Sequence, residues 1–358
     1  MSTRDKSPDL THAGRRRFLI GTSATVAGAL LYPDISARAA DTLTVADPGG
    51  PYGTAFTEAF YAPFNQLGIA KVTNVARVAE PTSQIKAMVE AKSFLWDVVS
   101  VSSSSHKLLS SQGLLDPLDW TDPEMQKLIP AAHQPDWMGT NVYGTVLAFR
   151  TDKMTRHPQS WADFYNVKDF PGRRALPKSP ITCLEGALLA DGVSAQQLYP
   201  LDVDRAFRKL DTIKPHVTNW WTSYGQTTQL LQTGEIDFLA TSNARVQAAI
   251  DSGAPVKIIW NQGLYGLEGW AIPKGSPKAA LAKKFIASCA NGHHQAAYTK
   301  LLAYGPTNPS AFDLIPAQRA AALPTFKDNF AQLTQIDDSW WGANKDKIFD
   351  RFNAWLLR

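Results

Sequence analysis

Alternation of strand and helix patterns constrains the fold of this chain more than any other feature. Residues 42–46, 72–78 and 96–101 have strand character, and a helical pattern follows each of them. The second half continues in this way, with strands expected at 143–149, 236–240 and 256–260 and helices at 204–213, 226–233, 245–251 and 277–290. Strands that alternate with helices favour largely parallel sheets covered by helices. The sequence therefore predicts an α/β fold.

The first 39 residues have the order of an export signal. A basic run, Arg15-Arg16-Arg17, precedes an apolar stretch at 20–31, and Ala37-Arg38-Ala39 supplies a cleavage site. The paired arginines before Phe18-Leu19 resemble a twin-arginine signal, which the twin-arginine export machinery reads. The apolar stretch is shorter than the roughly 20 residues of a membrane span. Residues 1–39 are thus predicted to be a twin-arginine-type signal peptide, and the rest of the chain is expected in the periplasm.

The charge of the chain changes once this signal is removed. The full chain has 36 Lys and Arg and 32 Asp and Glu, a net charge of +4. Six of the basic and three of the acidic residues lie in residues 1–39, so the mature chain carries about +1. It has no Lys/Arg cluster that would hold a phosphate backbone, which argues against binding to nucleic acid. Two cysteines, Cys183 and Cys289, are expected as buried thiols, because a twin-arginine substrate folds in a reducing cytosol.

Motifs of catalytic sites are missing from the sequence. It contains no G-x-S-x-G, H-E-x-x-H, G-x-x-x-x-G-K-[ST] or G-x-G-x-x-G pattern. His293 and His294 are adjacent, but neighbouring side chains on a helix point apart, so no metal site is predicted. A glycosidase pair of carboxylates stays open, although nothing favours it. We expect no cofactor and no enzyme activity; aromatic and small polar residues in the loops instead indicate a binding cleft.

An ordered series of motifs resembles family 1 extracellular solute-binding proteins, in particular the spermidine/putrescine-binding branch of ABC importers. The resemblance covers nearly the whole mature chain. The residues that carry it are Trp96-Asp97-Val98-Val99, the Ser-rich turn after it, Gly113–Leu118, Tyr143–Lys153, Pro158–Phe164, Phe170–Arg174, Gly234–Asp237 and Gly269–Gly275.

The resemblance implies a two-lobed periplasmic binding protein of type II-like fold. Each lobe would be a mixed, mostly parallel sheet flanked by helices, with the ligand in the cleft between lobes. Lobe one would comprise 41–148 plus 270–310, and lobe two 149–269 plus 311–358. A member of this family binds its ligand by hinge closure, docks on the membrane permease subunits, and is expected to be a monomer.

Candidate ligand contacts come from loops at the ends of the expected strands. In lobe one they are Tyr52, beside two glycines that permit close backbone approach, and the serines after the third strand; their alternatives are a surface tyrosine and simple helix capping. Tyr143 lines the cleft or is a buried hinge residue. The candidates of this group are Tyr52, Ser102, Ser103, Ser104 and Tyr143, and the family resemblance adds Tyr304, which matches a cleft aromatic of the family.

A second group follows from the resemblance to polyamine binders and from residue chemistry. Glu268 aligns with a carboxylate that holds a ligand amine, and the expected partner of this costly buried acid is a ligand ammonium or, alternatively, Arg245. Glu185 is a second acid, for which a helix-face carboxylate is the default. Trp220 and Trp221 face opposite ways in a strand, so one of them is expected beside the ligand, where it attracts an ammonium by cation–π attraction. Ser242 completes the set.

These residues predict a periplasmic receptor that captures a small cationic or zwitterionic, polyamine-like amine. A long polyamine needs acids at both ends, and only Glu268 is well supported. An amino acid derivative, such as a gamma-amino acid or a betaine, therefore stays open. Ferric iron would need converging tyrosines, and Tyr52, Tyr143 and Tyr304 are spread through the chain. A secreted enzyme is the remaining alternative.

Overall fold

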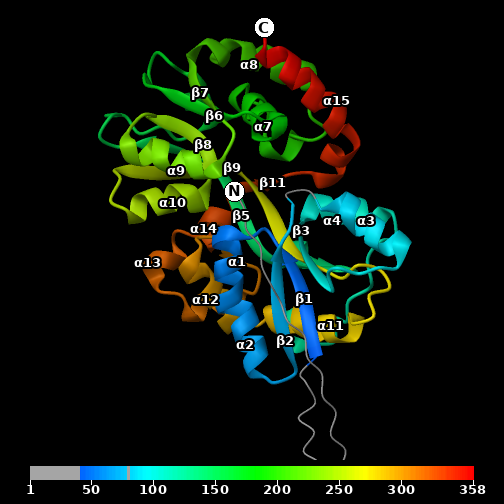
Figure 1. Ribbon diagram of the computed structural model, residues 1–358. Helices are drawn as coiled ribbons and strands as arrows, with labels where there is room; N and C mark the ends of the chain where they lie inside the picture. Colours follow the sequence, from blue (N-terminus) through cyan, green and yellow to red (C-terminus); the bar gives the residue numbers. More distant parts are fainter. Residues whose placement is uncertain (1–40, 79–80) are drawn as a thin grey trace, which may run out of the picture. The chain divides into compact units, whose positions relative to one another are not determined.

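The protein is described here by a computed structural model that covers residues 41–78 and 81–358 (Figure 1). The predicted signal peptide lies outside the described residues. The described part contains eleven strands that belong to one mixed sheet. They are β1 (Asp41–Asp47), β2 (Ala70–Ala76), β3 (Val98–Ser102), β4 (His133–Gln134), β5 (Trp137–Arg150), β6 (Arg174–Pro177), β7 (Val217–Trp221), β8 (Phe238–Ser242), β9 (Val256–Ala271), β10 (Gly305–Pro306) and β11 (Leu333–Gln335).

Helices connect most of these strands. They are α1 (Gly50–Phe56), α2 (Ala62–Gln66), α3 (Thr82–Ala91), α4 (Ser103–Ser111), α5 (Pro123–Gln126), α6 (Trp161–Tyr165), α7 (Pro180–Ala190), α8 (Val203–Ile213), α9 (Tyr224–Thr233), α10 (Asn243–Asp251), α11 (Ala279–Cys289), α12 (Gly292–Leu301), α13 (Ala317–Ala320), α14 (Lys327–Phe330) and α15 (Asp338–Leu356). A π-helical turn at Thr57–Tyr61 joins α1 to α2, and short 3₁₀ turns include Pro309–Leu314. No helix within 41–78 and 81–358 has the length and apolarity that crossing a membrane requires.

The strand order of the sheet is β2-β1-β3-β9-β5-β8-β6-β7. Strands β1, β2 and β3 are mutually parallel, and so are β6, β7 and β8. Strand β9 pairs antiparallel with β3 and β5, and β5 pairs antiparallel with β8, whereas the short β11 pairs parallel with β9. Figure 1 shows β5 and β9 between these two sets of parallel strands. The α/β prediction is confirmed. The sequence predicted only 143–149 and 256–260 of the two connecting strands, which are much longer.

The apolar residues form separate cores on the two sides of the connecting strands. The first core is built mainly from residues 43–142 and 267–323, and it contains Cys289. The other two clusters take residues 146–264 together with the C-terminal helix α15, and the larger one contains Cys183. Both cysteines are therefore free, buried thiols in different cores.

The packing of the C-terminal part differs from the sequence expectation at one place. Residues 311–323 were assigned to lobe two, but Ala311, Ile315, Ala320 and Leu323 pack in the first core. The reason is local, because the turn Pro309–Leu314 packs against α12, which belongs to the same core. The rest of the division into lobes stays a prediction.

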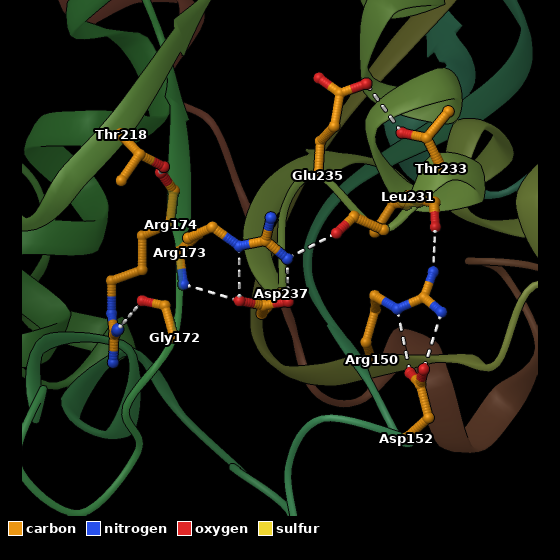
Figure 2. Close-up of polar contacts among 11 residues, drawn as sticks. Arg150, Asp152, Gly172, Arg173, Arg174, Thr218, Leu231, Thr233, Glu235 and Asp237 are labelled. Carbon is orange, nitrogen blue, oxygen red and sulfur yellow. Dashed lines mark hydrogen bonds and ion pairs between the residues drawn. The ribbon is translucent and has the colours of Figure 1, made fainter.

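Arginines fix the edge at which β5, β6 and β8 meet (Figure 2). Arg150 holds Asp152 with two hydrogen bonds of 2.9 Å and donates to the carbonyl of Leu231 at 2.6 Å. Arg173 donates hydrogen bonds to the Asp237 carboxylate from its own backbone amide and from two of its guanidinium nitrogens. Burial raises the pKa of Asp237, but these bonds outweigh it and hold the pKa below its ordinary value.

Arg174 is buried completely on the other side of this edge, with 1% exposure. Its guanidinium donates to the backbone carbonyls of Phe164, Gly172 and Phe170 and lies over the rings of Phe164 and Phe238. Burial lowers the pKa of Arg174 to about 10, which still leaves it charged at neutral pH. One side chain thus satisfies three carbonyls that would otherwise be buried without a donor.

Replacement of Arg174 by alanine should strongly destabilise the fold. The change leaves three carbonyls unsatisfied at about 1–3 kcal/mol each, so we expect a loss of at least about 3 kcal/mol of unfolding free energy. Arg208→Ala, on the exposed face of α8, is the matched control and should change stability by less than about 0.5 kcal/mol. Urea denaturation of both variants checks this. Equal stability of the two variants would contradict the role given to Arg174.

Candidate functional site

The carboxyl ends of the parallel strands define where a ligand can bind. In open α/β sheets, ligands bind in the crevice outside these ends. In the first half, β1 leads into α1 and β3 leads into α4; in the second half, β7 leads into α9 and β8 into α10. The beginnings of these helices carry backbone N–H groups without a partner in their own helix, which favours negatively charged ligand groups there.

Glu268 lies on β9, directly opposite Ser102 of β3. Its side chain is nearly buried, and its Oε1 accepts a hydrogen bond of 2.5 Å from the Ser100 hydroxyl and one of 2.8 Å from the Arg77 guanidinium. Arg77, and not Arg245, is thus its structural partner. The alternative that named Arg245 is wrong, because Arg77 follows β2 and reaches across the ends of the neighbouring strands.

Three tyrosines that the sequence placed far apart lie near this acid. The rings of Tyr52 and Tyr304 are stacked, with centroids 5.4 Å apart and planes at 25°. Burial raises the pKa of Tyr52 well above its ordinary value, and Tyr304 and Glu268 add to the rise. Burial also raises the pKa of Tyr143, with Asp338 and Glu268 as further causes. Tyr52 and Tyr143 are therefore neutral phenols whose pKa values respond to the charge of Glu268.

Arg245 and Ser242 lie at the beginning of α10. The Nε of Arg245 and the hydroxyl of Ser242 are buried and have no hydrogen-bond partner among the described residues. The intervening Asn243 fixes the helix start, since it accepts from the Gly144 amide at 3.0 Å and donates to the Ala303 carbonyl at 2.6 Å. A guanidinium nitrogen and a hydroxyl without partners at a helix N-terminus form a site for an anionic group.

Tyr224, the first residue of α9, connects this end to the tyrosines. Desolvation raises the pKa of Tyr224 to about 12, Tyr304 adds to the rise, and Arg245 opposes it. The side chain of Tyr224 is about half exposed, and the charges that influence its pKa are those of Tyr304 and Arg245. Arg245, Tyr224 and Tyr304 are thus electrostatic neighbours.

The three predicted serines have different environments. Ser102 caps α4, accepting from the Ser105 amide at 3.2 Å, and its hydroxyl lies 3.0 Å from that of Ser104. Ser103 has a buried hydroxyl for which the structure shows no hydrogen bond within the described chain. The Ser103 hydroxyl instead lies close enough to Asp338 to lower the pKa of that carboxyl.

Sequence reasoning missed Asp338, the first residue of α15. This helix packs against α4 (Figure 1), and Asp338 lies beside Ser103. Burial raises the pKa of Asp338 to about 6, Asp337 adds to the rise, and Ser103, Lys107 and His106 oppose it. The C-terminal helix had not been predicted as a source of site residues, and the acidic pair before Trp340 was the available signal.

Asn141 was also missed. It lies directly opposite Glu268 on β5 and is fully buried, and neither its Oδ1 nor its Nδ2 has a partner among the described residues. Buried polar atoms usually have hydrogen-bond partners, so Asn141 is unusual for a core residue. An isolated asparagine in a strand gives no sequence signal for this.

Two predicted contacts are not brought together with the others. Glu185 is fully buried, and its carboxylate accepts hydrogen bonds from the Thr182 amide, the Tyr199 hydroxyl and the Trp341 indole at 2.7–2.8 Å. Trp220 packs against α15, in contact with the rings of Phe352 and Trp355. Both side chains serve the packing of the second half.

Trp221 is the tryptophan nearer to the strand ends. Its indole donates to the Ala240 carbonyl at 3.1 Å, and its ring centroid lies 5.1 Å from that of Tyr224. Trp221 is therefore held by this hydrogen bond and packs its ring against that of Tyr224.

The described residues contain no cluster of three His, Cys, Asp or Glu side chains that could hold a metal ion. His294 instead places its Nδ1 2.8 Å from the Ser288 carbonyl. The site thus consists of two arginines, two acids, four tyrosines and a few hydroxyls and amides. Such an arrangement is suited to recognising charged groups on a small molecule.

Residues 55–325 match the family of bacterial extracellular solute-binding proteins, and the chain belongs to this family. A gamma-aminobutyric acid-binding protein of Pseudomonas aeruginosa is 37% identical over 324 residues, which are 88% of this chain and 91% of that protein. An ABC transporter substrate-binding protein of Bradyrhizobium japonicum is 36% identical, with a TM-score of 0.82 over 88% of this chain and 99% of that chain. The structure of a GABA receptor is 32% identical, with a TM-score of 0.81 over 88% and 98%.

The predicted family resemblance and the two-lobed binding-protein fold are thereby confirmed. The homologues of this chain are solute-binding proteins of ABC importers. Such proteins capture small molecules outside the cytoplasm and interact with permeases.

The structure predicts that Glu185 matters for stability. Glu185→Ala leaves three buried donors without an acceptor, and we expect it to lower the unfolding free energy by at least about 3 kcal/mol. Ser104→Ala, with a partly exposed hydroxyl at the start of α4, should cost less than about 1 kcal/mol. Chemical denaturation measures both values. A Glu185→Ala protein as stable as the wild type would show that this carboxylate is not a structural group.

Proposed function

We propose that the protein is the periplasmic substrate-binding component of an ABC importer and that it captures a small zwitterionic amine of the GABA type. Two similar proteins are a GABA-binding protein and a GABA receptor, which supports this ligand class. The protein would reach the periplasm through the twin-arginine machinery, act as a monomer, need no cofactor and perform no chemistry on its ligand.

The observation that carries the proposal is the buried, unpartnered Nε of Arg245 at the start of α10. A guanidinium binds a carboxylate with charge-assisted hydrogen bonds, and a helix N-terminus adds to the attraction. The Ser242 hydroxyl beside it offers a further donor. This end of the crevice would therefore hold the ligand carboxylate.

The ammonium end would lie between the tyrosines and Asp338. Asp338 is the acid that the C-terminal helix contributes next to Ser103, and its charge raises the pKa of Tyr143. Aromatic faces attract an ammonium by about 0.5–2 kcal/mol, and the stacked Tyr52 and Tyr304 supply such faces. An aliphatic chain of a few carbons would connect the two ends.

This arrangement weighs against the other ligands. A polyamine needs an acid at each end, but Glu185 is used in the core and Glu268 is already paired with Arg77. A betaine has no N–H to donate to Asp338. Ferric iron would need ionised tyrosines, whereas burial raises the pKa of Tyr52 and of Tyr143. An enzyme would need a nucleophile and a base, and the site offers neither arrangement.

Isothermal titration calorimetry of the mature protein should detect GABA binding. Arg245→Gln should weaken it by about 100-fold, because the carboxylate loses its charged partner. Arg156→Gln is the control, since this residue pairs with Asp169 in a solvent-exposed position, and it should leave the Kd within about twofold. Binding of putrescine or Fe³⁺ without any binding of GABA would refute the proposed ligand class.

The affinity for GABA should fall in acid. The pKa of Asp338 is about 6, so protonation below this pH removes the negative charge that would attract the ammonium. We expect the Kd to rise up to about tenfold for each pH unit below 6 and to be constant between pH 7 and 8. Asp338→Asn should bind weakly and without this dependence. Parallel pH profiles of the wild type and Asp338→Asn would contradict the assignment.

A further inference from the structure

Arg77 and Glu268 form an ion pair at the edge where β1, β2 and β3 end. The Nη2 of Arg77 lies 2.8 Å from the Oε1 of Glu268, and only 6% and 12% of the two side chains are exposed. Arg77 is held in place by further donation to the carbonyls of Ser100 at 2.6 Å and Val78 at 2.9 Å. These contacts fix the position of the guanidinium at this edge.

The pair lies among the residues proposed to bind the ligand. Glu268 is opposite Ser102 on one side and opposite Asn141 on the other, and Tyr143 follows two residues later on the same face of β5. Charge on Glu268 influences Tyr52 and Tyr143. A group that neutralises this carboxylate thus changes the charge that a ligand meets.

The charges of the crevice can be compared with those of candidate ligands. Arg245 and Asp338 provide one positive and one negative group. Glu268 alone would add a second negative charge and favour a dication, but Arg77 cancels it. The four side chains together are neutral when the acids are ionised, which is also the net charge of a zwitterion.

We propose that Arg77 is a specificity-determining residue, which excludes diamines by neutralising Glu268 and so restricts the receptor to zwitterions. The inference rests on the proposed function, because it concerns the same crevice. Its physical basis is the cost of burying an unpaired charge. A second ammonium beside Arg77 would be repelled by the guanidinium and would have to compete with it for the carboxylate.

Removal of Arg77 should admit a diamine. In Arg77→Met, the carboxylate of Glu268 keeps Ser100 as a donor but loses its cation, and putrescine should bind at least tenfold more tightly than it binds the wild type. The double variant Arg77→Met/Glu268→Gln lacks both charges and should return to the wild-type preference for GABA. Calorimetry with putrescine and GABA measures these preferences, and circular dichroism checks the fold.

The opposite substitution tests the same idea without the loss of a buried cation. Glu268→Gln keeps the size of the side chain and one acceptor oxygen at this position and removes the negative charge beside Arg77. It should increase the affinity for glutarate, which has a carboxylate where GABA has its ammonium, by at least tenfold. This variant keeps the inference testable if Arg77→Met does not fold.

The outcomes separate the two claims. Folded variants that bind putrescine and glutarate no more tightly than the wild type would overturn the role of Arg77, even if the wild type binds GABA. A wild type that does not bind GABA would overturn the proposed function, whereas gains of putrescine and glutarate binding in the two variants would still support the effect of Arg77 on ligand charge.

Discussion

The pairing of β5 with β9 is the constraint on which the rest of the structure depends. The two strands run antiparallel from Arg150 opposite Val256 to Met138 opposite Trp270. They pass from one core to the other, so each residue on them is fixed relative to both halves of the sheet. At Gly269 an added Cβ would collide with the Met138 carbonyl and the Trp137 ring, so the close approach requires glycine.

This pairing also places the site. Glu268 is on β9 immediately before Gly269, and Asn141 and Tyr143 are on β5 just after a register shift at 139–141. A bulge re-aims the side chains that follow it. The parallel strands on the two sides run in opposite directions and end toward the middle of β5 and β9, so that Ser103 from α4 lies on one side and Arg245 from α10 on the other. Charged and aromatic groups from distant parts of the sequence meet because the two long strands are shared.

Local patterns were sufficient to predict the alternation of strands and helices and several of the residues that meet. Tyr52 was identified because it follows the first strand, whereas Tyr304 was identified from the family resemblance and Arg245 from its charge. The partner of Glu268 could not be predicted, because Arg77 is 191 residues away in sequence and reaches it only through the order of β1, β2, β3 and β9.

The sequence analysis also misplaced Glu185 and missed Asp338, for similar physical reasons. Glu185 has the residue type of an amine ligand, but a kink at the start of α7 turns its carboxylate toward the amide of Thr182 and toward Trp341 of the C-terminal helix. Asp338 belongs to that same helix, whose packing against α4 no local pattern reveals. Sequence periodicity describes single elements. These contacts instead depend on the packing of α15 against α4 and α7, which are far from it in sequence.

Several buried polar groups without a partner in the described chain belong to the proposed site, while others, such as the hydroxyls of Tyr165 and Tyr298 and the Oδ1 of Asn219, do not. A buried donor or acceptor without a partner costs about 1–3 kcal/mol, so a fold rarely keeps several of them close together. Yet the hydroxyls of Ser103 and Ser242, the Nε of Arg245 and the amide of Asn141 all lack partners in the described part of the chain, and all lie at the strand ends or on the connecting strands. Their combined cost is reasonable only if a bound molecule or ordered water supplies the missing hydrogen bonds. The same groups that weaken the unliganded fold would then strengthen ligand binding, which couples the stability of the protein to occupation of its crevice.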